Sequence, residues 1–109
     1  MIFDFKSMEE TNLADFKGGN GTLHARMHTD EHGKIMYGRL EPGCSIGFHK
    51  HETSSEIIYI LSGKADYLYD DTKESASAGS CHYCPKGHSH AMMNNSSEDL
   101  VFFAVVPEQ

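Results

Sequence analysis

The sequence predicts an all-β protein, a sandwich or barrel built from short strands. Runs of about six residues with strand character recur along the chain, and in residues 22–28 apolar and polar side chains alternate. Turn residues separate these runs, as in Asp30-Glu31-His32-Gly33 and Pro85-Lys86-Gly87. The 109 residues suffice for one domain with a real core but not for two. Short strands at this spacing are typical of sandwiches and barrels.

Each expected strand is bounded by a turn signal. The second strand follows the turn at residues 30–33, the third follows Glu41-Pro42-Gly43, and the fourth ends at Ser62-Gly63. Residues 22–109 are expected to form the β-domain, whereas residues 1–21 form an N-terminal segment, either an edge strand or a short helix over residues 6–17. The expected strands are 22–28, 35–40, 45–51, 56–61, 64–69, 80–84, 88–93 and 100–106.

The third strand carries the most informative residues of the chain, His49 and His51, with Glu56 close behind. On a helix, residues two apart point in nearly opposite directions, so the two imidazoles could not bind one ion. On a strand they lie on one face, with alpha carbons roughly 6 to 7 Å apart. The next strand can return Glu56 to the same cavity. Two imidazoles and a carboxylate therefore predict a transition-metal site.

Two longer patterns around these residues resemble the two motifs of the cupin superfamily. In the first, residues 43–63 read Gly43, five residues, His49, one residue, His51, four residues, Glu56, six residues, Gly63. In the second, residues 79–94 read Gly79, five residues, Pro85, one residue, Gly87, two residues, His90, three residues, Asn94. They stand in the right order, about fifteen residues apart, so the chain resembles a small single-domain cupin of the conserved-barrel type.

The resemblance implies a jelly-roll β-barrel, the double-stranded β-helix, with a metal bound inside by His49, His51, Glu56 and His90. Three imidazoles and one carboxylate suit one divalent ion of iron, manganese, nickel, zinc or copper, rather than calcium or magnesium, which prefer oxygen ligands. Six-coordination would leave two positions open for a small oxygen-bearing molecule. Because a ligating histidine must be neutral, metal affinity is expected to fall at acid pH.

Three functions remain open for such a site, because cupins span all three. The favoured one is an iron-dependent dioxygenase, since it demands least of the protein beyond the metal. The second is a metal-dependent isomerase, in which His88 or Tyr37 acts as a catalytic acid-base group. The third is a domain that only binds a small ligand. His88 could equally be an ordinary loop residue, and His24 and His28 lie about 13 Å apart along a strand, too far to share an ion.

Charge and composition limit the classes of partner and the cellular location that are expected for the protein. The formal net charge of −7 argues against nucleic acid and against an anionic membrane surface, because both need clustered Lys and Arg. Neither a transmembrane run nor a signal peptide is visible, and a cytoplasmic location is the default expectation.

Strand parity also predicts which side chains face the cavity and which face outward. Counted from Glu56 and His90, the residues Ile58, Ile60 and Met92 point inward, so the cavity is expected to be apolar beyond the metal. The outward residues are mostly apolar as well, which predicts a homodimer that covers them. A further expectation is that Ile2, Phe3 and Phe5 add a strand to the partner's sheet. The outward set is Cys44, Ile46, Phe48, Lys50, Ile57, Tyr59 and Leu61.

Overall fold

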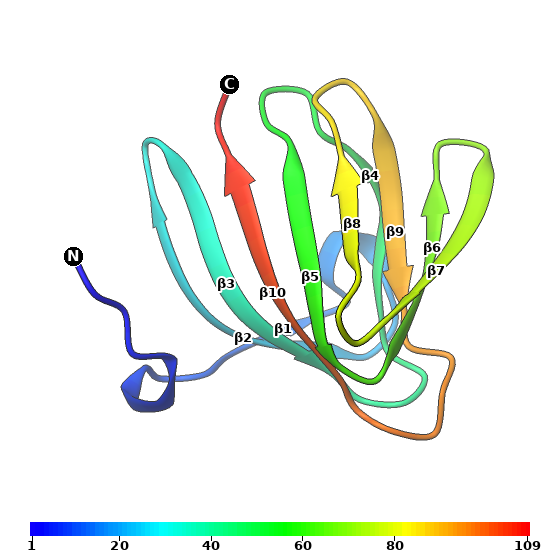
Figure 1. The fold of residues 1–109 in the computed structure, drawn as a ribbon, viewed down its shortest axis with the longest axis horizontal. Helices are drawn as coiled ribbons and strands as arrows, with labels where there is room; N and C mark the ends of the chain where they lie inside the picture. Colours follow the sequence, from blue (N-terminus) through cyan, green and yellow to red (C-terminus); the bar gives the residue numbers. More distant parts are fainter.

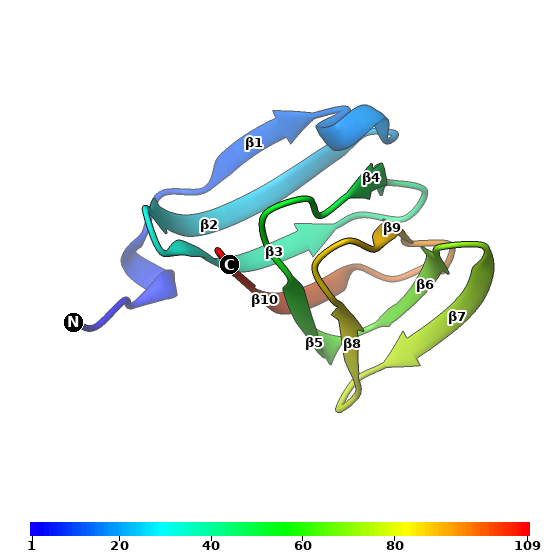
Figure 2. The same cartoon turned by 90° about the horizontal axis from the view of Figure 1, so that it is seen from above.

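Two antiparallel sheets face each other in the computed structural model, which describes all 109 residues. One sheet has six strands in the order β1-β2-β3-β10-β5-β8, and the other has four in the order β4-β9-β6-β7. Figures 1 and 2 show the sheets curving around a shared interior, with the N-terminus extending away from the body. This architecture confirms the predicted all-β jelly roll in a chain of one domain.

All eight predicted strands are present, together with β1 and β7, which form one edge of each sheet. β1 matches the edge-strand alternative for residues 1–21, whereas β7 was not predicted. The sequence of β7, Thr-Lys-Glu-Ser-Ala-Ser, is almost entirely polar and exposed, so it lacks the alternation that marks a half-buried strand. The strands are β1 Thr11–Ala14, β2 Thr22–Asp30, β3 Gly33–Leu40, β4 Ser45–Lys50, β5 Glu56–Ser62, β6 Lys64–Tyr69, β7 Thr72–Ser77, β8 Cys81–Cys84, β9 Ser89–Met93 and β10 Leu100–Pro107.

Of the two alternatives for the N-terminal segment, the short helix over residues 6–17 does not form. That stretch holds only two single-turn 3-10 helices, η1 Phe5–Ser7 and η2 Phe16–Gly18, with β1 between them. β1 pairs in register with β2, so sheet hydrogen bonding at the edge replaces the helix that local composition allowed. No helix of the chain is both long and apolar enough to cross a membrane.

The core lies between the sheets and follows the period of two. In β5 and β10 every second residue is buried over most of the strand, and the predicted inward residues Ile58, Ile60 and Met92 are buried. The predicted outward residues Ile57, Tyr59 and Leu61 are exposed. The core cluster contains Leu23, Ala25, Met36, Leu40, Ile46, Ile58, Ile60, Ala65, Tyr67, Met92, Leu100, Phe102 and Ala104.

β4 departs from simple alternation and corrects the prediction for Ile46. The register against β9 shifts between Ile46 and His49: three steps along β4 match two steps along β9. This β-bulge inserts one residue, so Ile46 and His49 both face inward. Ile46 is buried in the core rather than pointing outward, while Phe48 keeps its predicted exposure.

Candidate metal centre

The four predicted ligands meet at one point between the two sheets. His49 on β4 and His90 on β9 are register partners in the four-stranded sheet, so their side chains share a face. His51 follows β4 directly, and Glu56 begins β5 in the opposite sheet. The loop that carries His51 is held to the turn before β9, because His51 N–H donates to the His88 carbonyl at 2.9 Å.

The donor atoms stand at distances that suit one ion. The Nε2 atom of His51 lies 2.9 Å from that of His90 and 3.2 Å from that of His49. Oε1 of Glu56 lies 3.0 Å from Nε2 of His90 and 3.2 Å from Nε2 of His51. All four ligand atoms lie within 4.8 Å of one another. Two nitrogens bound at about 2.1 Å and at right angles to each other would be about 3.0 Å apart, so the residues fit a metal.

Each histidine has a hydrogen-bond partner at its other ring nitrogen. His49 Nδ1–H donates to the Gly47 carbonyl at 2.8 Å, and His51 Nδ1–H donates to Ser54 Oγ at 2.9 Å. His90 Nδ1 lies 3.0 Å from Nε2 of His82. A proton on every Nδ1 leaves every Nε2 lone pair directed at the shared centre. The Gly47 carbonyl can only accept, so it selects this tautomer of His49, and the Ser54 hydroxyl can accept from the same tautomer of His51.

His90, His82 and Glu74 form a chain of hydrogen bonds. His82 on β8 has a fully buried side chain that stacks on the ring of Tyr67 with centroids 3.9 Å apart. Its Nδ1–H donates to Oε1 of Glu74 on β7 at 2.7 Å, which leaves its Nε2 free to accept from His90 Nδ1–H. Glu74 is half exposed, so the chain links the interior to the surface. A carboxylate at the end of such a chain makes the ligating imidazole a stronger donor.

Electrostatics keep the ligands in their binding forms. Burial raises the pKa of Glu56, but hydrogen bonds with His51 and His90 outweigh it and hold that pKa at about 2. Burial lowers the pKa of His49, with repulsion from His90 and His51 acting in the same direction. At neutral pH the site therefore offers a carboxylate and a neutral imidazole without first losing protons.

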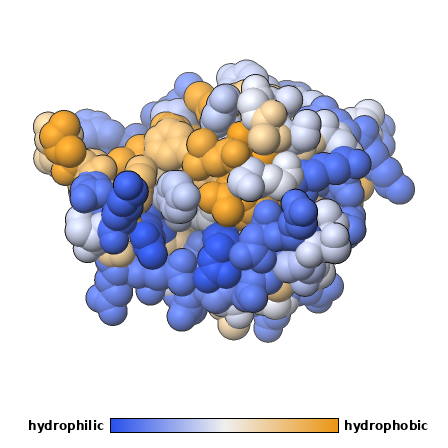
Figure 3. All heavy atoms as spheres, turned by 60° about the horizontal axis from the view of Figure 1, so that its bottom comes forward, coloured by the Kyte–Doolittle hydropathy of each residue, from blue (hydrophilic) through white to orange (hydrophobic).

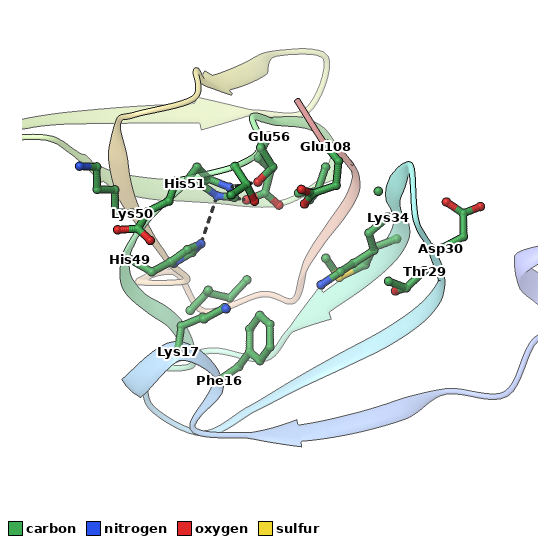
Figure 4. Close-up of a pocket in the computed structure, with 17 residues that line it drawn as sticks. Phe16, Lys17, Thr29, Asp30, Lys34, His49, Lys50, His51, Glu56 and Glu108 are labelled. Carbon is green, nitrogen blue, oxygen red and sulfur yellow. Dashed lines mark hydrogen bonds and ion pairs between the residues drawn. The ribbon is translucent and has the colours of Figure 1, made fainter.

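The centre opens onto a cavity of about 390 Å³ (Figure 4). His49, His51 and Glu56 contribute to its wall. Most other lining residues are polar or charged, so the prediction of an apolar cavity beyond the metal is wrong. The apolar inward residues fill the core instead. The cavity is lined by Phe16, Lys17, Thr29, Asp30, Gly33, Lys34, Met36, Ile46, His49, Lys50, His51, Glu52, Thr53, Ser54, Glu56, Val106 and Glu108.

The two residues predicted as catalytic acid-base groups lie outside this cavity. The His88 side chain is half exposed, and its Nδ1 lies 2.6 Å from Oδ2 of Asp70. Tyr37 lies on the outer face of the six-stranded sheet, where its ring stacks on Phe5 with centroids 5.6 Å apart. The structure therefore brings neither of them to the metal ligands.

Sequence reasoning missed several residues that shape the site, namely Ser54, Glu74, His82, Lys17 and Lys34. His82 carried a usable signal, because strand parity in β8 places it on the same face as buried Cys84. Lys34 likewise shares a face of β3 with buried Met36. Ser54, Glu74 and Lys17 depend on how loops and edge strands pack, which no local pattern encodes.

The fold and the site define the chain as a small jelly-roll domain with a largely buried group of three histidines and one glutamate that could hold a metal ion. The family model described as "Cupin domain" matches residues 36–106. The chain belongs to the cupin family.

Among known proteins, the chain is similar to one from Thermotoga maritima named oxalate-binding protein. The two are 31% identical, over 97% of this chain and 93% of the relative. A solved structure of a predicted oxalate decarboxylase from Thermotoga maritima shares 26% identity with a TM-score of 0.93, and the match covers both chains completely. The Schizosaccharomyces pombe Cnp3 cupin domain, 12% identical over 98% of this chain and 73% of that one, has a TM-score of 0.79 and shares the fold.

Proposed function

We propose that this protein binds one divalent transition metal at His49, His51, Glu56 and His90, and through it a small oxygen-chelating dicarboxylate of the oxalate type. The observation that carries the proposal is the convergence of three Nε2 atoms and one carboxylate at the floor of an open cavity. A bound metal would supply a Lewis acid for ligand oxygens. Iron, manganese, nickel, zinc and copper all suit this donor set.

The protein's own residues prepare the site for that ligand. Gly47, Ser54 and His82 each place a hydrogen-bond acceptor at Nδ1 of one of the three histidines. Glu56 balances one of the two positive charges of a divalent ion, which leaves a net charge that attracts an anion. Three imidazoles and one carboxylate leave two positions in a six-coordinate shell, and a bidentate dicarboxylate needs two.

The names of the two Thermotoga maritima proteins, one oxalate-binding and one a predicted oxalate decarboxylase, support oxalate as the first ligand to test. Dioxygenase chemistry stays a prediction, and oxygen uptake by iron-loaded protein over a panel of small diketones, thiols and phenols tests it. The isomerase alternative loses support, because its expected bases His88 and Tyr37 lie outside the cavity.

Metal content and calorimetry test the proposal together. Protein purified without chelator should hold close to one transition metal per chain, and the metal-loaded protein should bind oxalate with a stoichiometry of one. The double variant His49→Ala, His51→Ala should lose the metal and the oxalate binding. The double variant His24→Ala, His32→Ala removes two histidines outside the site and should keep both. Metal retained by the first variant would refute the ligand assignment.

We also propose that a second copy of the chain covers the outer face of β5 and β8. Four large apolar side chains there, Ile57, Tyr59, Leu61 and Tyr83, are each at least 40% exposed, and Ile57 is the register partner of Tyr83. Figure 3 shows hydrophobic residues from the protruding end at the left to the middle of one face, among mostly hydrophilic residues. An exposed cluster of this kind marks an interaction surface.

Light scattering at micromolar concentration tests the homodimer. The expected mass is twice that of one chain, and Tyr59→Lys should give the monomer because it places a charge in the centre of the interface. Phe48→Lys changes an exposed aromatic residue on the other sheet and should leave the dimer intact. A monomeric wild-type protein would refute the proposal.

A further inference from the structure

Two lysines and an aromatic ring form a part of the cavity wall that the metal centre does not use. Lys17 Nζ lies 5.5 Å from the centroid of the Phe16 ring, and Lys34 Nζ lies 5.6 Å from the same centroid. Figure 4 shows Phe16 and Lys17 across the cavity from His51 and Glu56. Phe16 and Lys17 belong to η2, whereas Lys34 belongs to β3, so two separate segments bring their charges to one ring.

Neither ammonium group has a carboxylate partner within 4.0 Å, although the chain carries an excess of acidic residues. The only ion pairs of Lys or Arg are those of Arg39. Two positive charges that share one ring repel each other, and the ring offsets this only in part. This arrangement leaves uncompensated positive charge at the cavity wall, which a bound anion would neutralise.

The segment that carries Lys17 is held firmly against β4. A side chain at Gly47 would place its Cβ 2.0 Å from the Lys17 carbonyl oxygen, and one at Gly19 would lie 2.2 Å from the Ser45 carbonyl oxygen. Backbone hydrogen bonding adds to this contact, since Ser45 N–H donates to the Asn20 carbonyl at 2.8 Å. Lys17 itself has a left-handed backbone with φ of 56°. Such a conformation persists only where surrounding contacts hold it, so the backbone that carries the lysine is fixed beside the cavity.

Four carboxylates line the cavity, those of Asp30, Glu52, Glu56 and Glu108, and none of them forms an ion pair with Lys17 or Lys34. Asp30 is engaged by His28, whose Nε2 lies 2.9 Å from Oδ2 of Asp30. Glu56 belongs to the metal ligands, and Figure 4 shows Glu108 near His51 rather than near Phe16. The cavity therefore has a metal-binding end and a cationic end.

We infer that Lys17, Lys34 and Phe16 form a second anion-binding subsite, and that the ligand is a chelating carboxylate with a further carboxylate at its other end. This inference rests on the proposed function, because the metal would hold the chelating end. Oxalate has only two carbons, and chelation uses both of its carboxylates, so it leaves no group for the lysines. A longer acid, such as a 2-oxo dicarboxylate, presents the 2-oxo acid oxygens to the metal and the distal carboxylate to the subsite.

Calorimetry on the metal-loaded protein with a matched pair of probes tests the subsite. 2-Oxoglutarate and 2-oxopentanoate share the chelating group and differ by the distal carboxylate. The wild-type protein should prefer 2-oxoglutarate by about tenfold or more, because two charge-assisted contacts at a half-exposed site contribute about 1.4 kcal/mol or more. Lys17→Gln and Lys34→Gln should each lower this preference about threefold and leave oxalate affinity within twofold. Lys64→Gln, on β6 and outside the cavity, should change neither.

Equal affinity of the wild-type protein for the two oxo acids would overturn the subsite, as would equal losses for both acids in the lysine variants. If neither oxo acid binds, the subsite is also overturned, and oxalate binding then decides the proposed function separately. The proposed function itself would fail if the metal-loaded protein bound none of the three acids, oxalate, 2-oxoglutarate and 2-oxopentanoate.

Discussion

Removing the nitrogen atoms of His82 should weaken metal binding although His82 is not a metal ligand. In His82→Phe the ring can still stack on Tyr67, but His90 Nδ1–H loses its acceptor at a buried position. An unsatisfied buried donor costs about 1 to 3 kcal/mol, which corresponds to about 5-fold to 150-fold in affinity. This range overlaps the 10-fold to 100-fold loss that is typical when the partner of a ligating histidine is removed.

Glu74→Gln should have a smaller effect in the same direction. The glutamine oxygen can still accept from His82 Nδ1–H, so the bond survives and only its charge is lost. Because the Glu74 side chain is 46% exposed, solvent screens that charge, and the expected loss is about 0.5 to 1 kcal/mol, or about twofold to fivefold in affinity.

The assay is competition for Mn²⁺ or Zn²⁺ between each variant and a chromophoric chelator at pH 7. Asp66→Asn is the matched control: it also removes a negative charge where β6 pairs with β7, but Asp66 bonds Ser75 and Asn95 and has no link to His90. Denaturant unfolding of the metal-free proteins separates loss of the fold from loss of the metal. Unchanged metal affinity in both His82→Phe and Glu74→Gln would refute the idea that this chain supports His90.

Two further predictions concern stability. Gly47→Ala should lower the free energy of unfolding by about 1 to 3 kcal/mol because its Cβ would collide with backbone of η2. Gly43→Ala should cost about 1 kcal/mol, because Gly43 has open space around it and only its left-handed φ of 83° would strain a side chain. Equal losses for the two variants in urea unfolding would contradict this difference. The metal-free protein should lose stability as pH falls below about 6.5, because the lowered pKa of His49 lets the unfolded chain take up that proton first. A second loss should begin below about 4.5, since the pKa of Glu56 is held near 2 in the folded state; a flat profile of unfolding free energy between pH 7 and pH 4 would contradict both assignments.

Much of the fold was predictable because its strands obey one local rule. In β5 and β10 the period of two persists for at least five residues, and it specifies both the strand and its buried face. The metal ligands were predictable for a similar reason. His49 and His51 share a face through strand geometry, and the next strand can return Glu56 to the same cavity. Motif spacing supplied His90, which local geometry alone could not place at the same depth.

The rest depends on contacts between segments far apart in the sequence. β7 is polar because it is an edge strand with little to bury, and it contributes Glu74 to a chain that also needs β8 and β9. Lys17 and Lys34 are ordinary charged residues in the sequence. The packing of η2 on β4 brings Lys17 to the cavity wall, and Lys34 reaches the same cavity from β3. The apolar-cavity prediction failed because it counted inward strand residues and omitted the loops that form the cavity mouth.

The bulge in β4 affects both the metal-binding end and the cationic end of the cavity. Simple alternation would force a choice between burying Ile46 and directing His49 inward, and the extra residue allows both. At the same point Gly47 accepts the Nδ1–H of His49 with its carbonyl and, lacking a side chain, lets the backbone of Lys17 come into contact. One glycine therefore sets the tautomer of a metal ligand and the position of a lysine on the cavity wall. Because both depend on the same few atoms, the metal-binding end and the cationic end of the cavity are held in a defined relation, as recognition of a ligand with two different ends requires.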